Sequence, residues 1–233
     1  VITSVVAENT TRVLSVFNVP VEEIQKQIDA VFEDIHVDAV KLGMLPTAEI
    51  ISAVADKLNE YKPSIIVCDP VMVATSGDAL SEGGTVSTMR EKLFPIVTLL
   101  TPNIPEAEAI SGLEIKNENH MEKAARIIMD MGVKNVLVKG GHLTGDAVDY
   151  LCTPEGVHKL ACKRVDSSNT HGTGCTLSSA ITANLAHGMD MLSAVTKAKN
   201  YITEAIEKSF TVGKGHSPVN HFYDYYDLKG TVL

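Results

Sequence analysis

Asp166-Ser-Ser-Asn-Thr-His-Gly-Thr-Gly-Cys175 runs directly into Thr176-Leu-Ser-Ser-Ala-Ile-Thr-Ala-Asn-Leu185, so that a polar, glycine-containing loop precedes a strongly helical segment. Glycines let the backbone turn tightly and approach a ligand closely. The first turn of the helix also leaves N–H groups without intrahelical partners at the positive end of the helix dipole. The sequence therefore predicts an anion site, suited to phosphate, at residues 172–175.

Cys175 stands at the start of this predicted helix. A helix N-terminus stabilises a thiolate, so we expect a lowered pKa for this thiol and consider it as a base or a nucleophile. A structural interpretation stays open, because glycine-rich loops also cap helices and cysteine is a common small core residue. The spacing is not that of a Walker A loop, since no Gly-Lys-Ser/Thr follows, nor that of a dinucleotide fingerprint, since the third glycine is lacking.

The composition restricts the class of protein. The chain has 233 residues, 45% of them hydrophobic, with no long charge run, so we expect a single folded domain over residues 1–233. The net charge of −9 argues against a nucleic-acid partner. A triphosphate could still be bound by local lysines, for which the candidates are Lys139, Lys197, Lys199 and Lys214.

The cysteines and the apolar runs bear on the compartment. None of Cys68, Cys152, Cys162 and Cys175 forms a Cys-x-x-Cys pair, and a chain of this size needs no disulfides, so we expect a reducing cytoplasm. No apolar run approaches the roughly 20 residues of a membrane helix, and no signal peptide is recognisable. The chain opens at Val1 within a predicted buried strand, from which we expect that upstream residues were lost or omitted.

Apolar periodicity predicts strands that alternate with helices. Strands are expected at 1–7, 39–42, 64–68, 97–100 and 135–139, and helices at 20–32, 47–58, 85–93, 105–111, 121–131, from Cys175 to about 188, and 193–210. A β-hairpin is expected over 147–165, turning at Pro154-Glu-Gly156. Short apolar strands alternating with helices are typical of an α/β fold with a parallel sheet covered on both faces.

The residues at the strand ends form a set, because ligands of parallel sheets bind beyond the carboxyl ends of the strands. The set comprises Glu8, Asn9, Gly43, Met44, Asp69, Asn103, Glu106, Lys139 and the loop at 172–175. Asp69 either starts a turn or supplies a carboxylate to a metal–phosphate site. Lys139 either meets an anion such as phosphate or extends to the surface.

Glu106 has two compatible interpretations. Asn103 and Glu106 have the spacing of a capping box, and Pro105 suits a first helical turn. Mg²⁺ tends to use one or two carboxylates plus phosphates, so Glu106 also qualifies as a carboxylate acting on Mg²⁺. Met44 and Met72 are either core residues or the walls of an apolar slot for a flat ring. The histidines His142, His171, His216 and His221 show no metal-ligand spacing.

A series of motifs occurs in one order along the chain. They are Lys41-Leu-Gly-Met-Leu45, Asp69-Pro-Val-Met72 with Ser76-Gly-Asp78, Thr101-Pro-Asn-x-Pro-Glu-Ala107, Val138-Lys-Gly-Gly-His142, Asn169-Thr-His-Gly-Thr-Gly-Cys-Thr-Leu-Ser178 and Gly213-Lys-Gly-His-Ser-Pro-Val-Asn-His-Phe222. The set resembles the bacterial hydroxymethylpyrimidine/phosphomethylpyrimidine kinases of the ribokinase-like superfamily. The resemblance implies a three-layer α/β/α sandwich with a mostly parallel central sheet, and phosphorylation of a pyrimidine alcohol and its monophosphate in thiamine biosynthesis. It also implies ATP, Mg²⁺, small-molecule partners and a homodimer.

The resemblance also implies residue roles. Cys175 stands where the superfamily usually carries an aspartate as catalytic base. The implied residues are Gly172, Thr173 and Gly174 with Cys175 in the anion hole; Asp69 and Glu106 on the Mg²⁺ side; Lys139, Thr170 and Lys199 on the nucleotide side; and Glu8, Gly43, Met44 and Met72 at the pyrimidine.

Two departures from the family pattern stand out. The glycine-rich N-terminal strand and loop of the family is not found, so we expect an omitted or disordered segment and a sheet that lacks a strand. Family members usually have Ala-Gln-Asn-Thr where this chain has Ala7-Glu8-Asn9-Thr10. Glu8 can accept from an exocyclic amine, but it cannot donate to a ring nitrogen unless one partner is protonated.

Three alternatives therefore stay open. A pyridoxal or pyridoxine kinase acts on a flat ring with a similar hydroxymethyl group. A thiol nucleophile would use Cys175 with His142 or His171 as its partner. A non-catalytic protein would only bind the nucleotide or a vitamin precursor.

Overall fold

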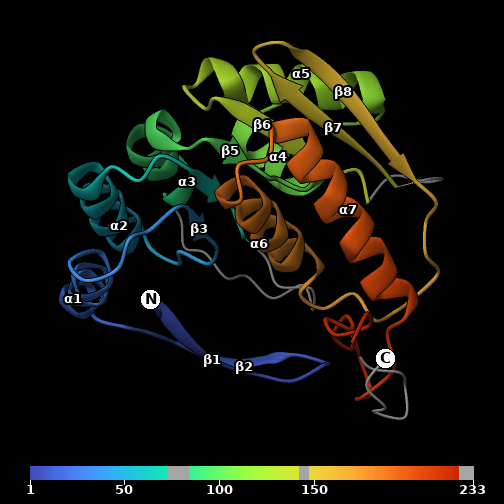
Figure 1. Ribbon diagram of the computed structural model, residues 1–233, viewed down its shortest axis with the longest axis horizontal. Helices are drawn as coiled ribbons and strands as arrows, with labels where there is room; N and C mark the ends of the chain where they lie inside the picture. Colours follow the sequence, from blue (N-terminus) through green and yellow to red (C-terminus); the bar gives the residue numbers. More distant parts are fainter. Residues whose placement is uncertain (73–83, 142–146, 226–233) are drawn as a thin grey trace.

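A six-stranded sheet organises the computed structural model, which describes residues 1–72, 84–141 and 147–225 (Figure 1). The strand order is β3-β4-β5-β6-β7-β8. The strands β3 (Val40–Leu42), β4 (Ile66–Cys68), β5 (Leu99–Leu100) and β6 (Asn135–Val138) are parallel. β7 (Ala147–Thr153) and β8 (Gly156–Cys162) form the expected antiparallel hairpin at one edge. Ser76-Gly-Asp78 and His142 lie outside the described residues.

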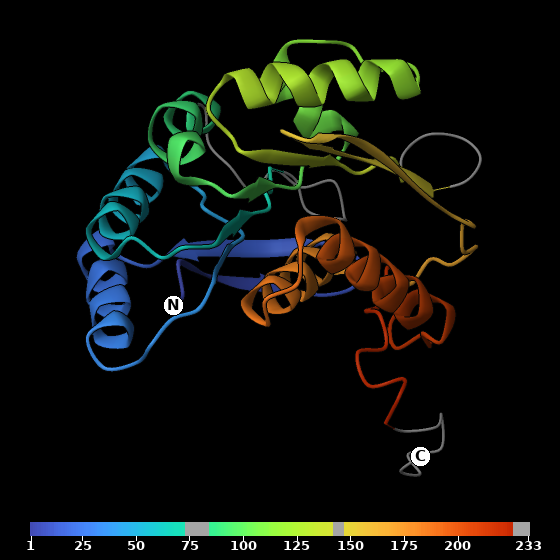
Figure 2. The same cartoon turned by 45° about the horizontal axis from the view of Figure 1, so that its top comes forward.

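Alternating residues of the central strands point into two separate cores, since successive side chains of a strand face opposite ways. Cys68, Leu100 and Val136 face one core, which α1 (Val21–Phe32), α2 (Ala48–Tyr61), α4 (Ile104–Ser111) and α5 (Glu118–Asp130) cover. Val67 and Leu99 face the other, which α6 (Thr173–Ala186) and α7 (Met191–Glu207) cover. Figure 2 shows the sheet between the two helical layers, which confirms the three-layer α/β/α prediction.

The helix ends follow local chemistry. The Thr47 hydroxyl caps α2 by accepting the Ile50 N–H at 3.2 Å, and Gly112 closes α4 in the left-handed region with φ 73°. The helix expected over 85–93 is instead divided into α3 (Thr85–Thr88), a π-helical turn (Met89–Leu93) and a 3₁₀ turn (Phe94–Ile96). Pro95 lies in the 3₁₀ turn and has no N–H to donate, so a regular α-helix cannot continue through it.

The strand expected over residues 1–7 is present, but its expected burial is wrong. β1 (Ser4–Glu8) pairs antiparallel with β2 (Val13–Asn18), which was not predicted, and the two form a sheet of their own (Figure 1). The side chains of Val5 and Phe17 are 57% and 67% exposed. An apolar run indicates β-structure, but it does not show which strand will pair with it or what will cover it.

The β1–β2 hairpin reaches across the edge of the main sheet at which the parallel strands end. At one end, the Thr3 hydroxyl donates to the Met44 carbonyl oxygen at 2.8 Å. At the other end, the Thr10 carbonyl oxygen accepts the His216 N–H at 2.8 Å.

Among the described residues, no helix is both long and apolar enough to cross a membrane.

Candidate active site

The loop before α6 forms a helix N-terminus of the predicted kind. Gly172 is the N-cap, with φ 78° in the left-handed region, where glycine carries no steric penalty. The Thr173 N–H and hydroxyl both donate to the Thr170 carbonyl oxygen, at 3.2 and 2.7 Å. Thr176 makes the first intrahelical bond, to Gly172 O at 2.8 Å. The amides of Gly174 and Cys175 therefore lie in the first turn, where helices bind anions.

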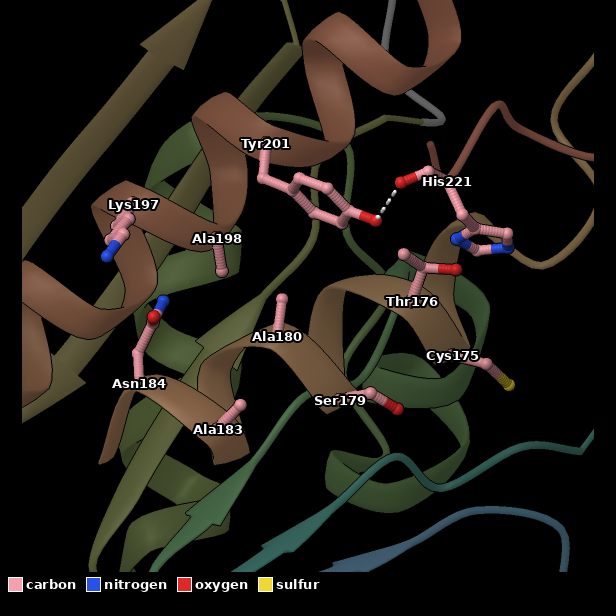
Figure 3. A pocket seen from close by; sticks show the side chains of 10 residues that line it. All are labelled: Cys175, Thr176, Ser179, Ala180, Ala183, Asn184, Lys197, Ala198, Tyr201 and His221. Atoms are coloured by element: carbon pink, nitrogen blue, oxygen red, sulfur yellow. Dashed lines mark hydrogen bonds between the residues drawn. The ribbon is translucent and has the colours of Figure 1, made fainter. Parts of the chain in front are cut away.

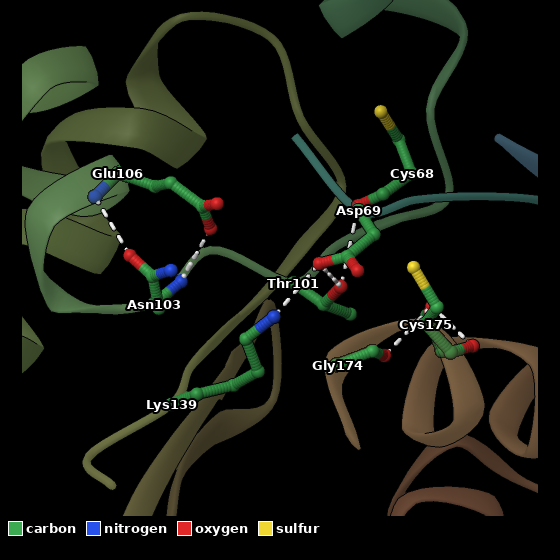
Figure 4. Close-up of polar contacts among 9 residues, drawn as sticks. Cys68, Asp69, Thr101, Asn103, Glu106, Lys139, Gly174 and Cys175 are labelled. Carbon is green, nitrogen blue, oxygen red and sulfur yellow. Dashed lines mark hydrogen bonds and ion pairs between the residues drawn. The ribbon is translucent and has the colours of Figure 1, made fainter. Parts of the chain in front are cut away.

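Three strand-end residues meet beside this helix N-terminus (Figure 4). Asp69 follows β4, Thr101 follows β5 and Lys139 follows β6. Lys139 Nζ donates to Asp69 Oδ1 at 2.7 Å, and the Thr101 hydroxyl donates to the same oxygen at 3.1 Å. Asp69 is only 2% exposed. The ammonium group of Lys139 thus does not extend to the surface but pairs with the buried Asp69 carboxylate.

Gly174 brings α6 against this group. A Cβ atom added to Gly174 would lie 3.2 Å from Lys139 Nζ and 3.4 Å from Asp69 Oδ2. The absent side chain lets the N-terminus of α6 approach the Asp69–Lys139 pair closely. The backbone amides of α6 and the Lys139 ammonium group are therefore near enough to act on the same anion.

Glu106 forms the predicted capping box at the start of α4. Its carboxylate accepts the Asn103 N–H at 2.8 Å and its own N–H donates to Asn103 Oδ1 at 2.9 Å, which confirms the capping box. Burial raises the pKa of the Glu106 carboxyl, although the nearby Lys139 ammonium group opposes the rise. Its carboxyl group is therefore electrostatically coupled to the Asp69–Lys139 pair.

The side chain of Lys139 stays protonated in this site. Burial by itself would lower the pKa of Lys139, but the carboxylates of Asp69 and Glu106 outweigh burial and the pKa lies above its usual value. The described residues contain no group of three or more His, Cys, Asp or Glu side chains arranged to hold a metal ion. Asp69 and Glu106 instead offer the one or two carboxylates that Mg²⁺ uses beside nucleotide phosphates.

The raised pKa of Glu106 predicts a pH dependence of stability. Between the usual glutamate pKa of 4.5 and the raised value, the folded state binds more protons than the unfolded state. The contribution of Glu106 to stability is therefore fully present below this interval and is lost as the pH rises through it. Glu106→Gln keeps an acceptor for the Asn103 N–H but cannot ionise. Urea unfolding should show the free energy of unfolding of the wild type falling relative to that of the variant over this interval, and parallel pH profiles would contradict the prediction.

The residues predicted to contact the pyrimidine make contacts with several different segments of the chain. The carbonyl oxygen of Met44 is bonded to Thr3, and the backbone N–H of Met72 hydrogen-bonds Glu106. Met72 also packs against the core, which supports the first of its two interpretations. Glu8 Oε1 lies 3.6 Å from His171 Nε2 in the loop before α6. Sequence reasoning missed this contact, because nothing local to either residue indicates the other.

Gly43 directly follows β3, precedes Met44, and is closely packed. A Cβ atom added to Gly43 would lie 2.6 Å from Lys41 Nζ, so this ammonium group rests on the Gly43 backbone. Any larger residue would require the lysine to move. At the predicted substrate site, the side chain of Lys41 therefore lies against the backbone of Gly43.

Lys199 does not join the Asp69–Lys139 pair. It lies on α7, is 7% exposed, and donates to the carboxylate of Asp149 in β7 and to Ala147 O, the latter at 3.1 Å. A direct contact between Lys199 and a nucleotide would have to break this buried pair. The sequence contained no signal for the pair, because the two residues are far apart in the chain.

A groove of about 540 Å³ lies between α6 and α7 (Figure 3). Cys175 lies at one end, and Asn184 and Lys197 lie at the other. The Tyr201 hydroxyl donates to the His221 carbonyl oxygen at 3.2 Å beside it. Cys175 is exposed, and its thiol is thus accessible from outside the core.

Comparison with known sequences identifies close relatives. A family model described as phosphomethylpyrimidine kinase matches residues 1–220. The thiamine biosynthesis bifunctional protein ThiED of Geobacter sulfurreducens is 48% identical over 230 residues, which are 98% of this chain and 47% of that protein. The hydroxymethylpyrimidine/phosphomethylpyrimidine kinase of Haemophilus influenzae is 41% identical, covering 95% of this chain and 84% of that protein. The chain thus spans about half of the bifunctional relative and most of the kinase.

Solved structures resemble the fold over most of its length. An ADP complex of Bacillus subtilis pyridoxal kinase matches with a TM-score of 0.87 at 36% identity, covering 94% of this chain and 84% of that one. Phosphomethylpyrimidine kinase from Clostridium difficile matches with a TM-score of 0.78 at 42% identity, covering 88% of this chain and 84% of that one.

Proposed function

Since this chain belongs to the phosphomethylpyrimidine kinase family, we propose that it phosphorylates 4-amino-5-hydroxymethyl-2-methylpyrimidine and then its monophosphate with ATP, for thiamine diphosphate biosynthesis. The observation that carries the proposal is the meeting of Lys139, Asp69 and the N-terminus of α6 at one edge of the sheet. Phosphoryl transfer requires mainly positioning and electrostatic stabilisation, which this arrangement suits. The proposal includes a single domain over residues 1–233 and, from the four unpaired cysteines, a cytoplasmic location.

In the proposed mechanism, bound Mg·ATP supplies the phosphoryl group. Cys175 as thiolate takes the proton from the substrate hydroxyl group as its oxygen attacks. The amides of the anion-hole loop at 172–175 hold the negative charge that develops on the phosphoryl oxygens. Asp69 and Glu106 are the residues that would hold Mg²⁺. Lys139 neutralises phosphate charge, and Thr170 supports the loop through its bonds from Thr173.

The proposed substrate site combines four residues near the β1–β2 hairpin. In this site Gly43 and Met44 flank the pyrimidine, Met72 adds an apolar wall beside Glu106, and Glu8 accepts from the exocyclic amine. The contact of Glu8 with His171 adds a donor beside an acceptor-only carboxylate. Because Glu8 accepts hydrogen bonds and His171 can donate one, the pair can contact a ring with a different arrangement of polar groups. Pyridoxal is therefore the second candidate substrate.

The test is ADP release by the full chain with Mg·ATP, comparing the pyrimidine alcohol with pyridoxal. We expect turnover on the pyrimidine, with a second phosphorylation visible by mass spectrometry. A preference for pyridoxal would make the chain a pyridoxal kinase, and no turnover on either alcohol would overturn the proposed reaction. The relatives named as kinases favour phosphoryl transfer over the thiol-nucleophile and non-catalytic alternatives.

We also propose that the protein forms a homodimer through the outer face of the β1–β2 hairpin. A two-stranded sheet is marginal alone, and the paired residues Val5 and Phe17 are both exposed on one face of this one. Phe17→Ser should shift the protein from dimer to monomer in light scattering. Phe210→Ser removes another exposed phenylalanine ring, on a segment outside the hairpin, and should leave the dimer intact. A monomeric wild type, or a dimeric Phe17 variant, would contradict the proposal.

A further inference from the structure

We propose that the buried ion pair of Asp149 and Lys199 positions Lys139 for phosphoryl transfer, acting through the backbone amide of Gly140. The inference rests on the proposed function, because it gives Lys139 its role. Asp149 and Lys199 are positioning residues in this scheme. Neither needs to touch the substrate or the nucleotide.

The carboxylate of Asp149 joins two parts of the fold. Its Oδ2 atom accepts from Lys199 Nζ on α7, and its Oδ1 atom accepts the Gly140 N–H at 2.9 Å. The residues of the pair are 6% and 7% exposed, so the contact is shielded from water. Since Gly140 directly follows Lys139, α7 is connected through a single side chain to the backbone that carries the active-site ammonium group.

The backbone at 139–140 is held on its other side as well. The Lys139 N–H donates to Pro102 O at 2.8 Å, and Lys139 forms an isolated parallel bridge with Asn103, the residue that caps α4 and bonds Glu106. A Cβ atom added to Gly140 would collide with the Val148 carbonyl group. The peptide is thus fixed between α4 and β7, and Lys139 Nζ is directed at Asp69.

Stability alone does not account for such a pair. Two charges lose their hydration on burial, and apolar residues of similar volume usually stabilise a fold at least as well. A hydrogen-bonded carboxylate, in contrast to an apolar side chain, fixes the direction of the Gly140 N–H. That direction matters at Lys139, because a displacement of about 1 Å in a catalytic arrangement can reduce the rate roughly a hundredfold.

The test compares two double variants that both remove the buried charges. Asp149→Asn with Lys199→Met keeps a side-chain oxygen for the Gly140 N–H. Asp149→Leu with Lys199→Met removes that oxygen. Both avoid leaving one buried charge unpaired, which would strongly destabilise the fold. A surface pair on the neighbouring strand and helix serves as control, as Glu118→Gln with Lys159→Met.

The measurements are kcat and KM with Mg·ATP, together with hydrogen exchange of the Gly140 amide by NMR. We expect the leucine variant to lose about tenfold or more in kcat with little change in KM, and to exchange the Gly140 amide faster. The asparagine variant and the control should stay within about threefold of wild type. Equal kcat values in the two folded variants, or equal exchange at Gly140, would overturn the proposal. A wild type without turnover would refute the proposed function. Hydrogen exchange at Gly140 would still show whether the Asp149 carboxylate holds the Gly140 N–H.

Discussion

The Cys175→Ala variant is expected to phosphorylate the pyrimidine alcohol about a hundredfold or more slowly than the wild type, the usual size of a general-base effect. The thiol stands in the first turn of α6, at the helix end that favours a negative charge. It is also exposed, so its removal leaves no cavity in the core. We therefore expect kcat to fall while the melting temperature and KM stay near the wild-type values.

Two further variants make this result specific to the thiol. Ser179→Ala removes another exposed polar group one turn later on α6 and should leave kcat unchanged. Cys175→Asp introduces the base that the ribokinase-like superfamily usually carries at this position, and it should recover part of the lost turnover. Stopped-flow or coupled ADP assays measure all three. Near-normal turnover by Cys175→Ala would show that another group takes the proton.

Lys139→Met is expected to lower turnover by roughly a hundredfold to a thousandfold, the loss typical of a removed electrostatic contact to the transition state. It should also destabilise the fold by about 3–5 kcal/mol, because breaking a buried ion pair leaves an uncompensated charge. Both Asp69 and Glu106 are almost wholly buried beside this ammonium group. Their mutual repulsion would then be unopposed.

A double variant separates the effect of Lys139 on stability from its effect on turnover. Asp69→Asn combined with Lys139→Met removes both charges of the pair, so urea unfolding should show much of the lost stability restored while turnover stays low. Lys159→Met breaks a half-exposed ion pair and should change stability by less than about 1 kcal/mol. Wild-type turnover in Lys139→Met would contradict the assigned role of the ammonium group. Unchanged stability would contradict the burial argument.

The strand-end residues show how far local patterns reach. Asp69, Glu106 and Lys139 were each identified because a polar residue follows a short apolar strand. Parallel strands end at the same edge of a sheet, so residues far apart in the chain come together there. The helix of residues 173–186 was also foreseeable, since its glycine N-cap and its apolar periodicity are local properties of the sequence.

The contacts between distant segments were not foreseeable. Lys199 has the same chemistry as Lys139, but it pairs with Asp149 because α7 packs over β7. Glu8 faces His171 because the β1–β2 hairpin crosses the sheet edge. The apolar run at residues 1–7 predicted a strand correctly in kind, but its pairing with β2 and its exposure depend on segments outside the run.

The sequence by itself determined the α/β architecture, the alternation of helices and strands, the helix caps and the residue types available at the sheet edge. These follow from periodicity, glycine and proline conformations, and hydrogen bonds that span a few residues. Only the tertiary structure decided that Lys139 meets Asp69, that Gly174 brings α6 close to both of them, and that Lys199 is buried against Asp149. The physical reason is that Coulombic and packing energies depend on distances in space, which the packing of helices on a sheet sets between residues that are remote in the chain.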